Sequence, residues 1–259
     1  MLDFIRETAL MAGALAKSGR ERLTAAAIHV KDTPTDMVTD IDREVERFII
    51  DRVRSKFPDH GFIGEETGRT DAEKEYCWII DPIDGTTSFI HDFPYWGVSI
   101  AVYRRGKPYA GAVFAPALDE LFSAEAGKGA TLNGRPIRVS KCGDIGSALL
   151  GTGFACVRDK RPRNNLEFFC RIVPKLQGIR RDGSAAFDLC QVAAGKYDGY
   201  WEFRLKIHDI AAGVVIAREA GALVTDADGG EDLTGNGLVC AAPGIHGTLL
   251  AEFAGHDIS

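Results

Sequence analysis

The sequence lacks several features that would place it in a specialised class of protein. No apolar run reaches the length of a membrane-spanning helix, and the first residues have neither the basic start nor the unbroken apolar stretch of a secretory signal. No two cysteines form a C-x-x-C pair, which argues against a zinc site. Internal repeats, low-complexity tracts and an obvious flexible linker are also absent. We therefore expect a globular, cytoplasmic protein whose cysteines are reduced and mostly buried.

An excess of positive charge is missing as well. The 31 Lys and Arg residues stand against 37 Asp and Glu residues, which gives a formal net charge of -6. This acidic balance argues against direct binding to nucleic acid. Apolar residues make up 45% of the 259 positions, so the chain can bury a sizeable core.

The first part of the chain alternates between helix and strand signals. Apolar spacing predicts amphipathic helices over residues 1–19 and 39–57, and Thr39 with Asp42 resembles a capping box at the start of the second. From Phe62 onward, short apolar segments separated by tight turns predict mainly antiparallel strands.

The pattern changes near residue 140, where strands and helices begin to alternate regularly. We therefore expect an N-terminal α+β half over residues 1–140 and a C-terminal α/β half over residues 141–259. Since no linker separates the halves, they are expected to share an extended interface with a site between them.

Two aspartates follow an apolar strand in the segment DPIDGTTSFIH, residues 81–91. Because Pro82 fixes its own backbone and has no N–H, a turn is expected that brings Asp81 and Asp84 together. Two such charges repel unless one is protonated or a cation lies between them. The stretch DPIDGT contains no histidine or cysteine, so its oxygen ligands, including the carbonyl of Ile83, suit Mg²⁺ or Mn²⁺ better than zinc.

The residues after these aspartates suit a phosphate group. Gly85 and Thr86 stand where a helix is expected to begin, and the free N–H groups of a helix start can bind phosphate oxygens. The same segment also fits an ordinary turn stabilised by aspartate, with no ligand.

Further carboxylates occur at two other predicted element boundaries. GFIGEETG, at residues 61–68, carries Glu65 and Glu66 at the end of a short strand, and a solvated turn is the alternative there. KIHDIAAG, at residues 206–213, carries Asp209 at the start of a helix, where a capping role is the alternative.

Four segments together resemble the inositol monophosphatase family of Mg²⁺-dependent, lithium-sensitive sugar phosphatases. They are GEE at residues 64–66, DPIDGTTSFIH at 81–91, RRDGSAA at 180–186 and HDIAAG at 208–213. The resemblance spans nearly the whole chain and implies a layered α-β-α-β-α sandwich that forms a homodimer.

The resemblance also implies two or three Mg²⁺ ions and a set of ligands. It assigns one ion to Glu65, Asp81, the carbonyl of Ile83 and Thr86, a second to Asp81, Asp84 and Asp209, and a weaker third site to the surroundings of Asp42 and Thr86. The implied reaction is hydrolysis of a phosphate monoester by a metal-activated water, without a phosphoenzyme.

The same resemblance implies roles in orienting the reactants. Asp42, Glu65 and Thr86 would orient the water beside Asp84, and the N–H groups of Gly85 and Thr86 would stabilise phosphoryl oxygens.

Substrate contacts are expected mainly from the second half, and from Asp209. Gly183, Ser184 and Ala185 would face the sugar, and Glu202 would accept hydrogen bonds from its hydroxyl groups. A helix cap is the alternative for Gly183 and Ser184, and a buried strand end is the alternative for Glu202.

The chain departs from the family pattern at two places. His208 stands where the family commonly has tryptophan; it would alter the pocket, bind substrate or serve as a structural histidine. A basic loop would contact a second phosphate or simply face water. Its charged residues are Arg158, Lys160, Arg161 and Arg163, and Lys31 is a further basic residue expected near the metals.

These observations predict an inositol-1-phosphate phosphatase that tolerates related polyol and sugar phosphates. Fructose 1,6-bisphosphate, adenosine 3′,5′-bisphosphate, histidinol phosphate and NADP are the alternative substrates within the superfamily. A role as a protein partner in a transcription complex is the alternative from another class, although an intact carboxylate cluster is costly without its metals.

Overall fold

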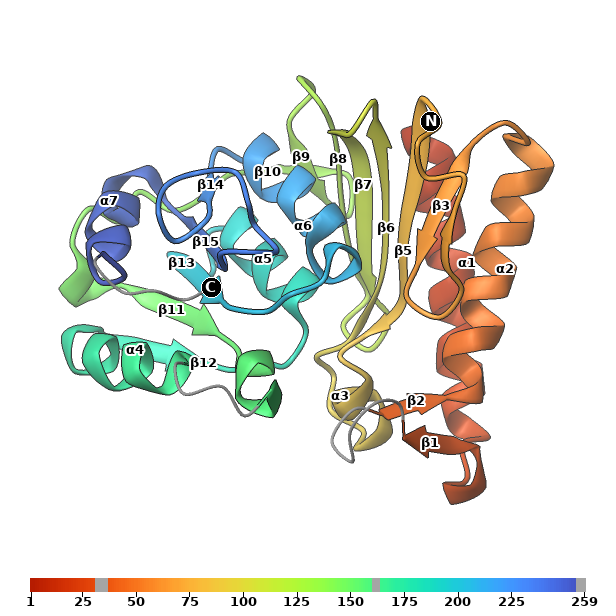
Figure 1. Cartoon of the computed structure of the whole chain (residues 1–259), viewed down its shortest axis with the longest axis horizontal. Helices are drawn as coiled ribbons and strands as arrows, with labels where there is room; N and C mark the ends of the chain where they lie inside the picture. Colours follow the sequence, from red (N-terminus) through yellow and green to blue (C-terminus); the bar gives the residue numbers. More distant parts are fainter. Residues whose placement is uncertain (31–36, 160–163, 255–259) are drawn as a thin grey trace.

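The computed structural model describes residues 1–30, 37–159 and 164–254 (Figure 1). Its α-helices are α1 (Leu2–Glu21), α2 (Asp40–Lys56), α3 (Thr86–Ile90), α4 (Asn165–Ile172), α5 (Ala185–Ala193), α6 (Ile207–Glu219) and α7 (Pro243–Ala251). Short 3₁₀ segments cover Ala25–Ala27, Ile145–Ser147, Ala155–Asp159 and Val173–Lys175.

The strands form a two-stranded ribbon and two larger sheets. The ribbon pairs β1 (Ile28–Val30) with β2 (Met37–Thr39). The large sheet contains β3 (Gly61–Gly64), β4 (Gly68–Thr70), β5 (Tyr76–Asp84), β6 (Gly97–Arg104), β7 (Lys107–Ala115), β8 (Glu120–Glu125), β9 (Ala130–Leu132) and β10 (Arg135–Ile137), in the order β10-β9-β8-β7-β6-β5-β3-β4. The small sheet contains β11 (Leu149–Thr152), β12 (Gly178–Arg180), β13 (Gly199–Glu202), β14 (Leu223–Thr225) and β15 (Leu238–Ala241), in the order β12-β11-β13-β15-β14.

The meandering antiparallel pattern expected for the first half is interrupted once. Strand β3 pairs with β5 in parallel, whereas the other neighbours in the large sheet are antiparallel. The reason is that β4 turns back along the outer edge of β3, so the chain enters β5 in the direction of β3. This pairing places the end of β3 and the end of β5 side by side.

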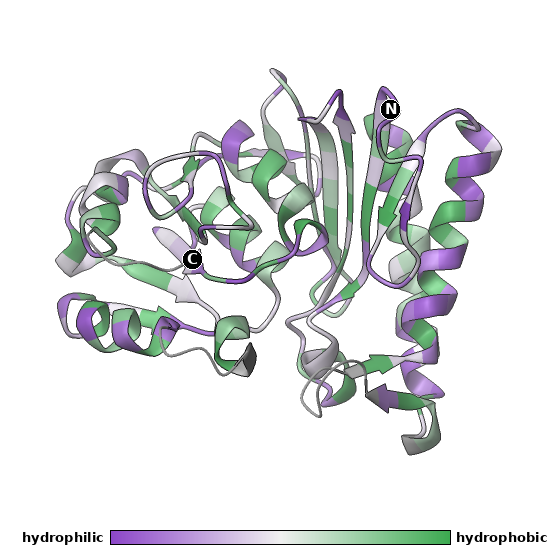
Figure 2. Cartoon of the chain, viewed as in Figure 1, coloured by the Kyte–Doolittle hydropathy of each residue, from purple (hydrophilic) through white to green (hydrophobic). Residues whose placement is uncertain are grey.

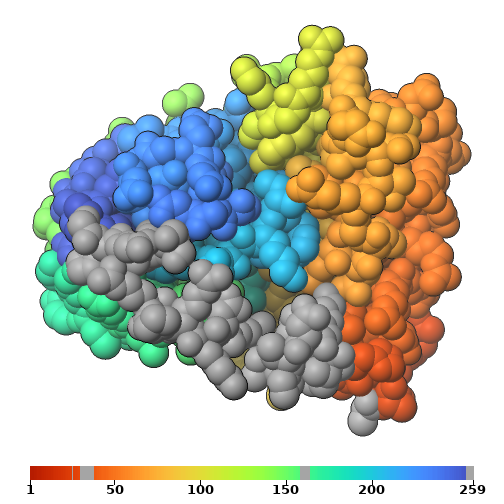
Figure 3. Space-filling model, in the orientation of Figure 1, coloured from red at the N-terminus to blue at the C-terminus, as the bar shows by residue number. Residues whose placement is uncertain are grey.

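Helices and sheets alternate in layers, which confirms the α-β-α-β-α sandwich. Helices α1 and α2 cover one face of the large sheet, α5 and α6 lie between the two sheets, and α4 and α7 cover the far face of the small sheet (Figure 1). In the space-filling view, light-blue residues of the second half press directly against orange and yellow residues of the first (Figure 3). Three apolar clusters fill the interfaces: one lies between α1, α2 and the large sheet, one lies on both sides of the α5 and α6 layer, and one lies between the small sheet and α4 and α7.

The burial of each helix follows from its sequence. Helix α2 alternates between hydrophilic and hydrophobic colours, as expected for a helix with one face in water (Figure 2). Helix α5 is buried at every position, because both of its faces pack against other layers. Within the described residues, no helix is both long enough and apolar enough to cross a membrane.

The central helix α6 lies unusually close to the large sheet. A Cβ atom added to Gly111 of β7 would lie 3.0 Å from the Cα atom of Ala212 in α6. A Cβ atom added to Gly213 would lie 2.7 Å from the Leu189 side chain of α5. Small residues on both sides therefore fix the position of α6 and of the residues at its N-terminus.

We expect Gly111→Ala to lower the free energy of unfolding by about 1–3 kcal/mol, because the added methyl group meets backbone atoms that have no room to move. Gly143→Ala is the matched control, since nothing lies within 4 Å of the corresponding Cβ position. Urea unfolding of both variants tests this, and equal stabilities would contradict the close packing of α6.

Candidate metal and phosphate site

The two aspartates of the DPID segment lie at the end of β5, where the structure differs from the expected turn. Strand β5 continues to Asp84, with Asp81 opposite Ser99 and Asp84 opposite Gly97 of β6. The register shifts between these pairs, because Pro82 has no N–H for the ladder and the intervening residues bulge. Asp81 and Asp84 are both buried, at 2% and 8% exposure.

Four carboxyl groups meet around this bulge: Glu65 from the turn after β3, Asp81 and Asp84 from β5, and Asp209 from the first turn of α6. Burial raises the pKa of Asp81 well above its usual range, and the nearby Glu65, Asp84 and Asp209 raise it further. Burial and the charge of Asp84 likewise raise the pKa of Asp209. The structure thus brings together all four carboxylates predicted from the sequence to hold metal.

Hydrogen bonds offset part of this repulsion at Asp84. Burial raises the pKa of Asp84 to about 7, while the Ser184 hydroxyl and the Ala186 N–H lower it by donating to Oδ2 at 2.5 and 2.7 Å. Ser184 also caps α5, since its Oγ accepts from the Phe187 N–H at 3.3 Å. Ser184 therefore ties a candidate metal ligand of the first half to the second half.

The donor set fits divalent cations. Burial and the carboxylates of Glu65, Asp84 and Asp209 all raise the pKa of Asp81, and no basic side chain is among its main influences. A cluster of this kind is costly unless cations neutralise it. Carboxylate oxygens with a backbone carbonyl nearby are ligands that suit Mg²⁺ and Mn²⁺.

Helix α3 begins at the residue expected for a phosphate-binding turn. Gly85 adopts φ 90°, and a Cβ atom there would lie 2.8 Å from the carbonyl oxygen of Tyr95, so only glycine fits. Thr86 Oγ1 donates to the carbonyl of Ile83 at 3.1 Å and lies 3.5 Å from Asp42 Oδ1. The predicted contact between Thr86 and Asp42 is therefore present, although it is long.

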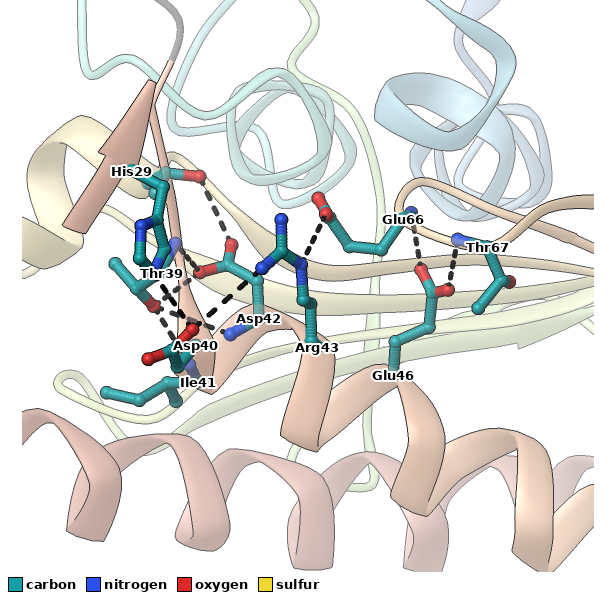
Figure 4. A network of polar contacts seen from close by, with 10 residues as sticks. His29, Thr39, Asp40, Ile41, Asp42, Arg43, Glu46, Glu66 and Thr67 are labelled. Atoms are coloured by element: carbon teal, nitrogen blue, oxygen red, sulfur yellow. Dashed lines mark hydrogen bonds and ion pairs between the residues drawn. The ribbon is translucent and has the colours of Figure 1, made fainter. Parts of the chain in front are cut away.

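Asp42 has the capping role that the sequence predicted, and its other oxygen faces the site. Its Oδ2 accepts from both the backbone N–H and the hydroxyl of Thr39, at 2.9 and 2.5 Å (Figure 4). Burial raises the pKa of Asp42 to about 7, against the lowering effect of the Thr39 hydrogen bonds. One carboxylate thus fixes the start of α2 and lies beside Thr86.

Two of the candidate substrate residues, Ser184 and Glu202, already form hydrogen bonds within the protein. Gly183 adopts φ 92° directly before the Ser184 cap. Ala185, the first residue of α5, is buried at 7% exposure beside them. Glu202 Oε1 accepts from the Ala155 N–H at 2.9 Å, and Oε2 accepts from the Tyr200 hydroxyl.

Three residues of the basic loop, Lys160, Arg161 and Arg163, lie outside the described residues. Lys31, the lysine expected near the metals, lies outside them as well. Arg158 belongs to the 3₁₀ segment Ala155–Asp159.

Glu46 is a positioning residue that the sequence interpretation missed. It lies one turn after Asp42 on α2, is fully buried, and accepts the backbone N–H groups of Glu66 and Thr67 at 2.9 and 2.8 Å (Figure 4). A Cβ atom on Gly64 would lie 2.5 Å from Glu46 Oε1, so the chain passes close over this carboxylate. Glu46 therefore holds the turn that carries Glu65. The available signal was a carboxylate on the apolar side of an amphipathic helix.

Comparison with known proteins assigns this chain to a family. The model of the inositol monophosphatase family matches residues 1–257. The chain belongs to the inositol monophosphatase family. Its resemblance to this family, inferred from four short segments, is thereby confirmed, and so is the corresponding fold.

Three similar proteins illustrate the range of names within the family. The chain is 42% identical over 247 residues to Nus factor SuhB of Pseudomonas aeruginosa, covering 93% of this chain and 90% of that protein. It is 45% identical over 202 residues to inositol-1-monophosphatase of Synechocystis sp., covering 78% of this chain and 70% of that protein. The solved structure of inositol monophosphatase from Anabaena (Nostoc) sp. superposes with a TM-score of 0.88 at 38% identity, covering 97% of this chain and 94% of that one. Family membership implies a metal-dependent phosphatase.

We expect Glu46→Gln to lower the free energy of unfolding by about 1–3 kcal/mol and to weaken Mg²⁺ binding. The glutamine NH₂ group would face either the Glu66 or the Thr67 N–H, and that backbone N–H would lose its acceptor. Thermal unfolding and Mg²⁺ titration calorimetry measure the two effects. Glu44→Gln is the control, since Glu44 is exposed on the same helix. A Mg²⁺ affinity equal to that of the control would show that Glu46 does not position the Glu65 turn.

Without metal, the protein should lose stability as pH rises. Asp42 and Asp84 have folded-state pKa values of about 7 against an ordinary 3.8, so between these values the folded state binds more protons than the unfolded state. Their contribution is fully present below about pH 3.8 and is lost as pH rises through about 7.

Because Mg²⁺ would bind the ionised carboxylates, we expect the increase in Tm caused by saturating Mg²⁺ to be larger at pH 8 than at pH 5. Differential scanning calorimetry with and without EDTA measures it. A Mg²⁺-induced increase that is the same at both pH values, or larger at pH 5, would contradict this assignment.

Proposed function

We propose that this protein is a Mg²⁺-dependent phosphate monoester hydrolase whose preferred substrate is inositol 1-phosphate, with tolerance for related polyol and sugar phosphates. The observation that carries the proposal is the group of buried and half-buried carboxylates beside the helix start at Gly85 and Thr86. The similarity to an inositol-1-monophosphatase of Synechocystis sp. supports the substrate class.

The residues that would hold the ions are those that surround the β5 bulge. The first ion is assigned to Glu65, Asp81, the carbonyl of Ile83 and Thr86, the second to Asp81, Asp84 and Asp209, and a weaker third to the neighbourhood of Asp42 and Thr86. Bound Mg²⁺ would lower the pKa of a water molecule and neutralise charge on the phosphoryl oxygens, and Mn²⁺ would serve in the same way.

The protein's own groups would orient the reactants. Thr86 Oγ1 lies between the Ile83 carbonyl and the Asp42 carboxylate, which leaves its lone pairs as acceptors for the attacking water. Glu65 would hold that water from the turn after β3. The N–H groups of Gly85 and Thr86, at the start of α3, would donate to phosphoryl oxygens as charge accumulates there.

Recognition of the sugar is assigned to the second half. Gly183, Ser184 and Ala185 at the start of α5, with Glu202 and Asp209, would surround the polyol. Because Ser184 donates to Asp84 at 2.5 Å, a substrate that contacts Ser184 necessarily lies beside the metal ligands. Fructose 1,6-bisphosphate, adenosine 3′,5′-bisphosphate, histidinol phosphate and NADP remain the alternative substrates.

The proposal includes the wider organisation of the protein. The halves are residues 1–140 and 141–259, supported by the observation that every strand of the large sheet precedes residue 140 and every strand of the small sheet follows it. A cytoplasmic homodimer is expected from the family resemblance.

A second function is favoured by one comparison. The similar protein of Pseudomonas aeruginosa is named a Nus factor, so we also propose a role for this chain as a protein partner in a transcription complex. Salt-sensitive retention of RNA polymerase components on the immobilised protein is the expected result. Retention equal to that of a bare resin would remove this second proposal.

Phosphate release from inositol 1-phosphate should require Mg²⁺, be inhibited by Li⁺, and fall by about 100-fold or more in Asp84→Asn, because a metal ligand loses its charge. Fructose 1,6-bisphosphate, adenosine 3′,5′-bisphosphate and NADP are compared under the same conditions. Asp119→Asn is the matched control: Asp119 is exposed in the turn between β7 and β8, with φ 54°, which asparagine tolerates.

Preference for a bisphosphate would replace the proposed substrate while keeping the mechanism. Absence of turnover on all four, by folded protein that binds Mg²⁺, would refute the substrate assignment.

A further inference from the structure

His208 lies among the candidate metal ligands. A single ligand atom from each of Glu65, Asp81 and His208 can be chosen so that all three lie within 4.8 Å of one another. The imidazole is buried, at 7% exposure, and its Nε2 lies 3.5 Å from Asp209 Oδ1. The histidine that replaces the family's common tryptophan is therefore part of the carboxylate cluster.

The position of His208 is fixed by the packing of α6. His208 and Asp209 are the second and third residues of this helix, and Asp209 Oδ2 accepts the Lys206 N–H at 2.6 Å. Close contacts of Gly111 with Ala212 and of Gly213 with Leu189 hold the same helix between the sheets. The imidazole thus comes from one of the most tightly packed elements of the fold.

We propose that His208 is a metal ligand, and that it binds the same ion as Glu65 and Asp81. The inference rests on the proposed function, because it takes Glu65 and Asp81 as ligands of an ion. Ligand atoms on opposite sides of an octahedral dication lie about 4.2 Å apart. The three ligand atoms lie within 4.8 Å of one another, so small side-chain movements would bring them to the distances that an ion requires.

Charge favours an imidazole at this place. Neighbouring carboxylates already raise the pKa values of Asp81, Asp84 and Asp209, so another anionic ligand would add to the repulsion. A neutral imidazole supplies a lone pair without adding negative charge. Four carboxylates together with two dications then give a cluster that is close to neutral.

The nitrogen ligand changes which ions the site prefers. Sites made only of oxygen suit both Mg²⁺ and Mn²⁺, whereas an imidazole ligand favours first-row transition ions, Mn²⁺ the least of them, over Mg²⁺. This refines the expectation from the DPID segment, which considered hard oxygen ligands alone. We infer that the protein discriminates in favour of Mn²⁺ over Mg²⁺ more strongly than a variant without the imidazole.

Electron spin echo spectroscopy of bound Mn²⁺ tests the ligand directly. The wild-type protein with one equivalent of Mn²⁺ should show modulation from a coordinated ¹⁴N, and His208→Gln should abolish it. His91→Gln is the matched control, since His91 is exposed, and it should keep the modulation. His208→Trp restores the residue common in the family and provides a second variant should the glutamine variant fail to fold.

Calorimetry gives the second measurement. Loss of a residue that only hydrogen-bonds to a metal ligand weakens metal binding by about 10–100-fold, and loss of the ligand itself should cost at least as much. Because Mn²⁺ gains more from a nitrogen ligand than Mg²⁺ does, His208→Gln should raise the Kd for Mn²⁺ at least about tenfold more than the Kd for Mg²⁺. Equal changes for both ions would overturn the proposal. So would Mn²⁺ that binds wild type without ¹⁴N modulation, modulation that persists in His208→Gln, or absence of Mn²⁺ binding.

The outcome can be separated from that of the proposed function. Nitrogen modulation in a protein that hydrolyses no phosphate ester would support the ligand assignment and refute the hydrolase. Mg²⁺-dependent hydrolysis without nitrogen modulation would support the hydrolase and refute the ligand assignment.

Discussion

Repulsion among buried and half-buried carboxylates is the constraint on which the rest of the site depends. Asp81 and Asp84 are held apart by a bulge in β5, Glu65 reaches them from the neighbouring parallel strand, and Asp209 reaches them from α6. Their neighbours raise the pKa values of Asp81, Asp84 and Asp209, so the folded chain holds an unfavourable arrangement that only cations or protons relieve. The remaining structure supplies the rigidity that keeps these groups together: the packed core around α6, the Ser184 hydrogen bond to Asp84, and the Glu46 carboxylate under the Glu65 turn.

Much of this architecture could be predicted from local sequence. The Thr39 capping box, the helix that begins after Gly85 and the strands around Phe62 and Tyr76 all follow from turn chemistry and apolar spacing, and the structure confirms them. The layered sandwich followed from the family resemblance rather than from spacing, because strand order depends on contacts between residues far apart in the chain.

Other features depend on long-range packing and left no clear local signal. The parallel pairing of β3 with β5 depends on the return strand β4, and the path of β5 through Pro82 depends on its partner β6. Glu46 resembles an ordinary helix carboxylate until the chain at Gly64 is seen to pass over it. The neighbourhood of His208, at the start of α6, could likewise be predicted only as a set of alternatives, since Glu65 and Asp81 precede it by more than a hundred residues.

The hydrogen bond from Ser184 to Asp84 spans 100 residues of sequence, and Asp209 joins the cluster later still. During synthesis, at about 5–20 residues per second, the first half emerges from the ribosome seconds before the helix that completes the site. Until then its aspartates have neither their serine donor nor their opposing carboxylate. The site is thus completed only once α6 has been synthesised, and binding of its ions reports that the two halves of the chain have come together.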